Sequence, residues 1–138
     1  MKVFLGGTCN GSDWRNLIIP MLSVEFFNPT VKTWPLEGME EKIPQRELCD
    51  IYLCFIVPSM DDSLYPIAEV IDDSNKRPQK TVFVCIREDE GWKFTYSQWK
   101  SLSAVAQMVE RNGGTVFDNL KDAALHINSM PTKNQPLK

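Results

Sequence analysis

Four carboxylates that could do chemistry lie close together in the middle of this chain. Asp50 precedes an apolar run, Asp61 and Asp62 follow it, and Glu69 lies in the first turns of the helix-like segment that comes next. Enzymes use carboxylates as general acids, general bases and nucleophiles. A strand–loop–helix connection of an α/β sheet brings such groups to the edge where ligands bind. We therefore expect chemistry here, with Glu69 as the leading candidate.

Other residues are predicted to reach the same edge because they follow the ends of strands. Gly6, Gly7 and Thr8 come after the first apolar run, Asn28 follows the second, and residues 59–63 follow the third. Paired glycines let a backbone approach a ligand closely, although after a strand they are more often a tight turn. The sequence thus predicts one crevice that these loops share.

The elements that must position these residues alternate between short apolar runs and segments of helical period. This pattern is typical of α/β proteins with a mainly parallel sheet. We predict a single Rossmann-like, flavodoxin-like domain over residues 1–130, a three-layer sandwich around a five-stranded parallel sheet, with a polar tail at 131–138. Strands are expected at Lys2–Leu5, Val24–Phe27, Ile51–Val57, Thr81–Ile86 and Thr115–Phe117, with about five helices between and after them.

Helix-start signals support this division of the chain. Ser12 is a plausible N-cap for a helix with Trp14 on its apolar face, and Pro66 fits a first helical position. Thr95 and Gln98 have the spacing of a capping box, and Asp118 or Asn119 can cap the last helix. Each of these signals lies where the spacing of apolar residues changes to that of a helix.

Composition narrows the function classes. The chain has 138 residues, 43% of them hydrophobic, and a net charge of -3, which provides no cationic field for nucleic acids. The N-terminal apolar run ends at Gly6 and Gly7, too early for a signal peptide or a membrane span. Four cysteines form no C-x-x-C pair. We expect a cytoplasmic protein with reduced thiols that binds neither nucleic acid nor membrane.

Cofactor and metal motifs are missing from the sequence. No G-x-G-x-x-G and no G-x-x-x-x-G-K-[ST] is present, and no His, Cys and Asp cluster has the spacing of metal ligands. His126 falls on a late helix, away from the predicted edge. We expect neither a cofactor nor a metal.

Several short motifs together resemble the nucleoside 2-deoxyribosyltransferase-like family, in a divergent form. In chain order they are Phe4-Leu-Gly-Gly-Thr8, Ser12-Asp-Trp-Arg15, Phe27-Asn-Pro29, Cys49-Asp50, Ile67-Ala-Glu69 and Asp73-Ser-Asn-Lys-Arg-Pro78. The resemblance spans about residues 2 to 127. It implies a five-stranded parallel Rossmann-like sandwich, in agreement with the strands inferred from the residues, and it implies a homo-oligomer.

The resemblance also implies a reaction. Glu69 matches the family's nucleophile, which attacks the anomeric carbon of a 2-deoxynucleoside and forms a covalent deoxyribosyl-enzyme intermediate before the sugar passes to another nucleobase. Asp50 matches the acid that contacts the base and handles the proton at the leaving nitrogen. The expected partners are a nucleoside or nucleotide and a free nucleobase. Substrate-binding residues are expected among Gly6, Gly7, Thr8, Ser12, Trp14, Arg15, Asn28, Asp62, Ser63 and Tyr65.

Two positions depart from the family pattern and leave alternatives open. Ser63 stands where the family has a sugar-binding aspartate, so Asp62 is the substitute. Phe4 stands where the family has a tyrosine that holds the nucleophile, so Tyr65 or no residue supplies that hydroxyl. The alternatives are a hydrolase, in which water takes the sugar from the same intermediate, and a non-catalytic nucleotide-binding module. Arg15, with Ser12 or Ser63, is the candidate for binding a 5′-phosphate.

Overall fold

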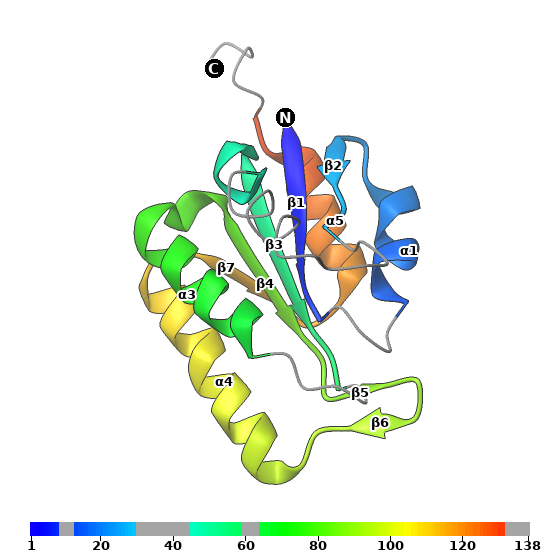
Figure 1. The fold of residues 1–138 in the computed structure, drawn as a ribbon, viewed down its shortest axis with the longest axis vertical. Helices are drawn as coiled ribbons and strands as arrows, with labels where there is room; N and C mark the ends of the chain where they lie inside the picture. Colours follow the sequence, from blue (N-terminus) through cyan, green and yellow to red (C-terminus); the bar gives the residue numbers. More distant parts are fainter. Residues whose placement is uncertain (9–12, 30–44, 59–63, 132–138) are drawn as a thin grey trace, which may run out of the picture.

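The computed structural model describes residues 1–8, 13–29, 45–58 and 64–131. Within them, an all-parallel sheet has the strand order β2-β1-β3-β4-β7 (Figure 1). The expected five-stranded parallel sheet is therefore confirmed. Its strands are β1 (Lys2–Gly7), β2 (Glu25–Phe27), β3 (Ile51–Ile56), β4 (Thr81–Cys85) and β7 (Thr115–Phe117).

A small antiparallel hairpin follows β4 and was not predicted. It consists of β5 (Glu88–Asp89) and β6 (Trp92–Lys93), joined by Glu90 and Gly91, both with positive φ angles. Strands of two residues have no alternating pattern long enough to read from a sequence. Glycine accepts a positive φ without strain, which explains Gly91 at this turn.

The helices begin and end where local chemistry allows. They are α1 (Trp14–Ile18), α3 (Tyr65–Lys76), α4 (Tyr96–Arg111) and α5 (Leu120–Ser129), and residues 45–48 are also helical. Pro20 falls in the short 3-10 helix η1 (Ile19–Met21) that ends the first helix, and a second one, η2 (Pro78–Lys80), follows α3. The predicted capping box of α4 is present, with Thr95 and Gln98 bonded in both directions at 3.1 and 2.9 Å. At α5, the Asn119 side chain accepts from the Asp122 N–H at 2.8 Å.

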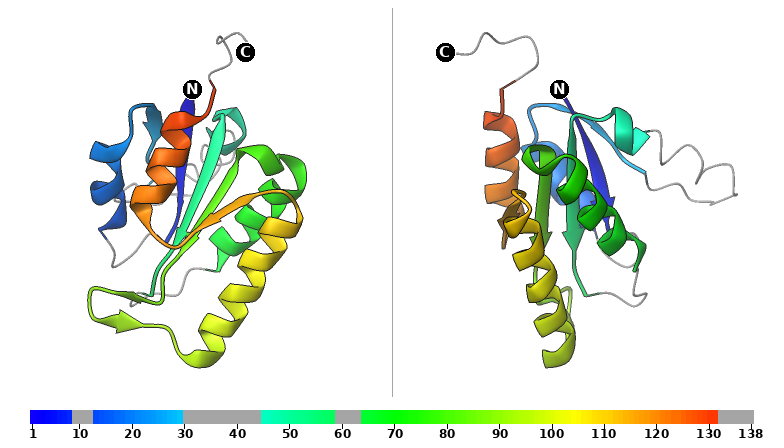
Figure 2. Two further views of the ribbon diagram at one scale, coloured as in Figure 1. Left: turned by 180° about the vertical axis from the view of Figure 1, so that it is seen from behind. Right: turned by 90° about the vertical axis from the view of Figure 1, so that its left-hand side faces the viewer.

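The sheet is covered on both faces (Figure 2). Helices α1 and α5 pack on one face, and α3 and α4 pack on the other. Strand β3 supplies both cores, because successive side chains of a strand point to opposite faces. Leu53 and Phe55 join the α1/α5 core, while Tyr52, Cys54 and Ile56 join the α3/α4 core.

The strand order reverses between β1 and β3. From β1 the chain crosses to β2 on one side, and it later places β3 on the other side of β1. The helices that follow β1 and β3 therefore lie on opposite faces, and the carboxyl ends of these strands border a crevice that commonly binds ligands. Gly7 stands opposite Phe55 in this register, which fixes the edge of the crevice.

No helix in the described part of the chain combines the length and the apolar character that crossing a membrane requires.

Candidate functional site

The two glycines at the end of β1 are required by packing against β3. Gly7 has a φ of 112°, and a Cβ there would collide with the Phe55 backbone. A Cβ at Gly6 would lie 2.7 Å from the Tyr52 hydroxyl oxygen and 2.5 Å from its ring. Both glycines let β1 and β3 come together where a side chain would not fit. Gly6 also leaves room for a tyrosine hydroxyl at the crevice edge.

Thr8, Trp14 and Arg15 together fasten the loop after β1. The Thr8 hydroxyl donates to the Val57 carbonyl at 3.3 Å and accepts from the Val57 N–H at 3.1 Å. The Thr8 carbonyl accepts from the Trp14 indole at 2.7 Å and from Arg15 Nη1 at 2.7 Å, while Arg15 Nε donates to the Leu5 carbonyl at 3.0 Å. These bonds hold the end of β1 against both β3 and α1.

Trp14 is a core residue, which corrects its prediction as a substrate-binding residue. Its side chain is 1% exposed and lies in the α1/α5 core, with its ring centre 5.0 Å from that of Phe55. Arg15 is 5% exposed, and its guanidinium lies 4.3 Å from the Trp14 ring centre. The two bonds that Arg15 donates to backbone carbonyls give it a positioning role at the edge where a phosphate was predicted to bind.

Glu69 lies in the second turn of α3 and is only 2% exposed. Arg46, from the helical residues 45–48, forms an ion pair with it, with Nε 3.5 Å from Oε2, and donates to the Glu69 backbone carbonyl at 3.3 Å. A buried carboxylate without a cation would be strongly disfavoured, so this guanidinium stabilises its negative charge. Glu69 is thus a buried carboxylate with a defined cationic partner.

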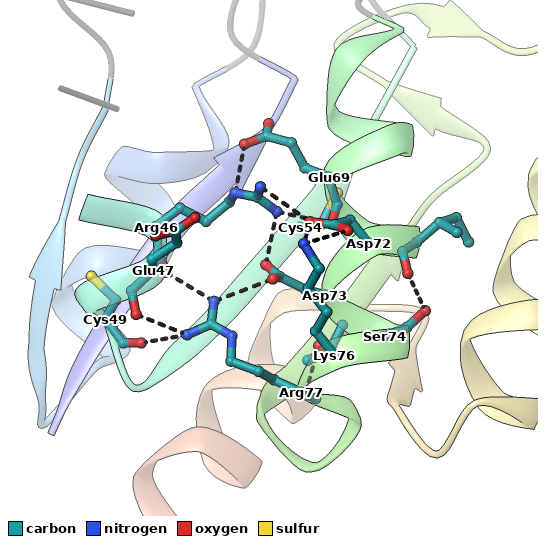
Figure 3. Close-up of polar contacts among 12 residues, drawn as sticks. Arg46, Glu47, Cys49, Cys54, Glu69, Asp72, Asp73, Ser74, Lys76 and Arg77 are labelled. Carbon is teal, nitrogen blue, oxygen red and sulfur yellow. Dashed lines mark hydrogen bonds and ion pairs between the residues drawn. The ribbon is translucent and has the colours of Figure 1, made fainter. Parts of the chain in front are cut away.

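Arg46 also contacts two further carboxylates of α3, as Figure 3 shows. Its Nη1 lies 3.3 Å from Asp73 and its Nη2 lies 3.4 Å from Asp72. Burial works to lower the pKa of Arg46, but the charges of Asp73 and Glu69, the largest of the opposing contributions, outweigh it, so the pKa is raised. Arg46 therefore stays fully charged at the centre of this group.

Arg77 completes the polar cluster at the end of α3. It pairs with Asp73 at 3.3 Å and donates to the carbonyls of Arg46 and Cys49 at 2.9 and 3.0 Å. The chain segment that carries Arg46 is therefore fixed by backbone bonds as well as by charge. We use the name carboxylate cluster for Arg46, Glu69, Asp72, Asp73 and Arg77.

Tyr52 carries a fully buried hydroxyl on the same face of the sheet. Its side chain is 0% exposed, and the hydroxyl forms no regular hydrogen bond with any other described residue. The Arg46 guanidinium lies 5.9 Å from the ring centre. Burial first, and then the neighbouring Cys54 thiol and the charge of Glu69, raise the pKa of Tyr52 well above its ordinary value. The hydroxyl therefore stays protonated and can act as a donor.

Asp50 lies at the amino end of β3, bonded to the backbone of Lys2. Its carboxylate accepts from the Lys2 backbone N–H at 2.9 Å, and its own N–H donates to the Lys2 carbonyl at 2.8 Å. The whole of β3 separates Asp50 from the carboxyl ends of the strands, a span of roughly 20 Å for six residues. Arg46, which pairs with Glu69, precedes Asp50 in the same segment, and the role of Asp50 at the leaving base stays a prediction.

The remaining predicted residues are only partly described. Asn28 follows β2 and is exposed, and β2 ends level with Phe4 rather than with Gly7. Tyr65 opens α3 and is 47% exposed, in contrast to the buried Tyr52. Ser12, Asp62 and Ser63 lie outside the described residues. Of the predicted set, the structure therefore brings Gly6, Gly7 and Thr8 to the crevice edge and buries Glu69 under the same face.

Sequence reasoning missed Arg46 and Tyr52. Arg46 is separated from Glu69 by 23 residues, and nothing in local spacing connects them. Tyr52 lies inside a continuous apolar run, where a tyrosine is read as core. A usable signal was the small residue Gly6 two positions after Phe4, since a glycine inside a buried strand indicates a close approach by another group.

No group of three or more metal-ligating side chains is gathered in a way that could hold an ion among the described residues. Comparison with protein-family models, with curated proteins and with solved structures gave no significant match. The chemistry of the site therefore has to be argued from its own geometry: a buried ion-paired carboxylate and a protonated phenol beneath the β1/β3 edge.

Proposed function

We propose that this protein breaks the N-glycosidic bond of a 2-deoxynucleoside or its 5′-monophosphate and transfers the sugar to another nucleobase. The observation that carries the proposal is Glu69, a buried carboxylate paired with Arg46 on the helix that follows β3, beside the strand-order reversal. A carboxylate held in this way can meet positive charge that develops on a sugar carbon.

The proposed reaction has two displacements. In the first, a Glu69 carboxylate oxygen bonds to the anomeric carbon while the bond from that carbon to the base nitrogen breaks. The leaving nitrogen keeps the bonding electron pair and takes a proton from solvent. In the second, the nitrogen of an incoming base attacks the anomeric carbon and gives up its proton to solvent, the ester bond breaks, and the carboxylate is restored. Splitting one difficult substitution into two easier steps is the advantage of covalent catalysis.

Arg46 and Tyr52 have supporting roles in this proposal. Arg46 keeps Glu69 negatively charged before the attack, and its contacts with Asp72 and Asp73 fix where the guanidinium lies. Tyr52 provides a neutral donor in the field of Glu69, taking the place that the sequence offered to Tyr65. Gly6 is the residue that makes space for that hydroxyl.

A base-exchange assay tests the proposal. The protein is incubated with deoxynucleoside, or with deoxynucleotide, and an isotope-labelled free base, and the labelled product is measured. Glu69→Gln keeps the size of the side chain and removes the nucleophile, so exchange should fall by about 10³-fold or more. Glu110→Gln is the matched control, since it makes the same change at an exposed carboxylate of α4, outside the carboxylate cluster, and it should retain exchange.

Intact-protein mass spectrometry gives a second readout. A deoxyribosyl adduct should accumulate with wild-type protein when no acceptor base is present, and Glu69→Gln should not form it. Base exchange that survives Glu69→Gln would overturn the proposal. Release of base without exchange would instead identify a hydrolase that uses the same intermediate.

A non-catalytic nucleotide-binding module is the second candidate. It is favoured by the 2% exposure of Glu69 and by the dense pairing around Arg46, which a purely structural ion pair would also show. Recovery of a tightly bound nucleotide, chemically unchanged after long incubation, would support this candidate. It would exclude both the transferase and the hydrolase.

We also propose that this protein is located in the cytoplasm and forms a homo-oligomer. Light scattering coupled to size-exclusion chromatography gives its mass in solution, and the mass of a single chain would contradict this part of the proposal.

A further inference from the structure

An apolar concave feature borders the crevice edge at Thr8 and lies against the first turns of α3. It has a volume of about 280 Å³ and is formed where the end of β3, the start of α3 and the first half of α4 meet, elements that can be followed in Figure 1. The described residues that line it are Thr8, Ile56, Val57, Leu64, Ile67, Phe94, Gln98, Ser101, Leu102 and Val105. We call it the α3/α4 pocket.

The α3/α4 pocket is separate from the carboxylate cluster. Ile67 lines the pocket, whereas Glu69, two residues later, faces Arg46. Two residues correspond to a rotation of about 200° around a helix, so the two side chains leave α3 on nearly opposite sides. A molecule in the pocket would contact α3 without reaching the nucleophile proposed above.

The lining of the pocket determines what can bind there. None of the described lining residues carries a charge, and most are aliphatic or aromatic. An ion entering such a site would lose its hydration without gaining a partner, which is strongly unfavourable. An uncharged apolar group loses little and is favoured. The described part of the lining therefore favours uncharged ligands.

The pocket also offers a flat wall and a limited polar edge. The Phe94 ring is held by stacking on Trp99, with ring centres 6.4 Å apart, and by a 2.9 Å bond from its N–H to the Arg87 carbonyl. The Gln98 side-chain oxygen accepts from the Thr95 N–H, so the amide nitrogen is the donor that Gln98 has left, and the Ser101 hydroxyl stands nearby on α4. Aromatic rings pack well on such a wall.

Leu64 leaves apolar surface exposed to water at the rim of the pocket. It is 80% exposed, although it lines the pocket. Most binding pockets are largely preformed, apolar, and supplied with a few polar groups that set orientation. A bound ring that covers Leu64 would remove apolar surface from water, which is favourable.

We propose that the α3/α4 pocket is a second binding site, for an uncharged aromatic ring compound with one hydrogen-bonding edge. The aromatic body packs between Phe94, Val57 and Leu64. Its polar edge meets Gln98 and Ser101. This site is independent of whether Glu69 acts as a nucleophile.

Benzamide and benzoate test the proposal as a pair of probes, because they have the same size and differ in charge. Saturation-transfer NMR with wild-type protein should show saturable binding of benzamide and binding of benzoate that is at least about tenfold weaker. Ser101→Phe fills the pocket from an exposed position and should reduce benzamide binding by about tenfold or more. Gln107→Phe, an exposed position outside the pocket lining on the same helix, is the matched control and should leave binding unchanged.

A measurement on wild-type protein alone guards against a variant that fails to fold. Titration with benzamide should shift the amide NMR signals of Phe94 and Ser101 and leave those of Arg46 and Asp73 in place. Equal binding of both probes, equal loss in both variants, shifts centred on the carboxylate cluster, or no saturable binding would each overturn the proposal.

Discussion

The two faces of the central sheet bury the same strands but contain different chemistry. On the α1/α5 face the core is apolar, and the buried cation Arg15 donates to the backbone carbonyls of Leu5 in β1 and of Thr8 just after it. On the α3/α4 face, apolar packing is joined by Tyr52, with a buried hydroxyl, and by the carboxylate cluster around Arg46. The α1/α5 face is mainly an apolar core, whereas the α3/α4 face also buries a group of ion-paired side chains.

The difference has an energetic meaning. A buried ion pair contributes little net stability, because desolvation offsets the attraction between the charges, and apolar residues of similar volume are often as stable. The carboxylate cluster should therefore add little net stability to the apolar cores that both faces contain. Charge buried on the α3/α4 face is better explained by a role in binding or chemistry, which is why the proposed function is placed there.

Removing Arg46 should cause the largest effect on the charged face. Arg46→Met keeps most of the side-chain volume but leaves Glu69 and Asp73 buried without their shared cation. Breaking a buried pair from one side costs about 3–5 kcal/mol. Urea unfolding at pH 7, followed by circular dichroism, measures the loss.

Lys76→Met is the matched control for that measurement. Lys76 pairs with Asp72 at 3.1 Å, but its side chain is 69% exposed, so the change should cost about 0.5 kcal/mol or less. Equal losses in the two variants would show that the cluster behaves as surface charge, and the contrast between the two faces would fail.

A substitution in the α1/α5 core should lower stability by a similar amount but should leave base exchange unchanged. Leu53 is 0% exposed in the α1/α5 core, and Leu53→Ala should cost about 2–5 kcal/mol through lost burial and the cavity left behind. Under the proposed function, base exchange per folded molecule should stay unchanged, because the side chain points away from the carboxylate cluster. Exchange that falls in proportion to the loss of stability would contradict the separation of roles.

The sequence was sufficient to predict the sheet but not the contacts on its charged face. Continuous apolar runs at β3 and β4, and the capping box of α4, are local signals that tertiary structure preserved. The position of Glu69 on the helix that follows β3 was also predicted, since it follows from a strand and helix that are close in sequence. These successes depend on short-range patterns.

The misses depend on long-range geometry. Arg46 reaches Glu69 across 23 residues, and no periodicity links their positions. Asp50 was assigned to the site through a motif match; it lies at the amino end of β3, and its role there stays a prediction. The sequence placed Trp14 both on the apolar face of a helix and among the substrate-binding residues, and its burial shows that it is a core residue. The positions of these residues depend on how far side chains reach and on which way the strands run, and local sequence patterns do not contain this information.

Tyr52→Phe should change the stability by a smaller amount than Arg46→Met or Leu53→Ala, and in the opposite direction. Tyr52→Phe removes a buried hydroxyl that lacks a regular hydrogen bond, and leaving such a group buried costs about 1–3 kcal/mol. The variant should therefore be as stable as wild type or more stable by about 1 kcal/mol, while base exchange falls if the hydroxyl assists Glu69. The shift of the urea midpoint at constant slope measures the stability. A clear loss of stability would mean that the hydroxyl is bonded in the folded protein.

Asp72 should show the smallest effect, and that effect should depend on pH. The hydrogen bond from Lys76 is the largest cause of a pKa below 3.8 for Asp72 in the folded state, although its side chain is 39% exposed. A folded-state pKa lower than the unfolded value means that the ionised form stabilises the fold above pH 3.8 and that this contribution disappears as the pH falls through the folded-state pKa.

Asp72→Asn should therefore lower stability by about 0.5 kcal/mol at pH 7 and by progressively less below pH 3.8. Wild type and variant are compared by urea unfolding across this range, with salt added at pH 7 to screen the pair. A difference that persists in acid and in high salt would show that Asp72 acts through packing rather than charge. The contrast between the two faces of the sheet would then rest on Tyr52 and on the buried pairs of Arg46 with Glu69 and Asp73.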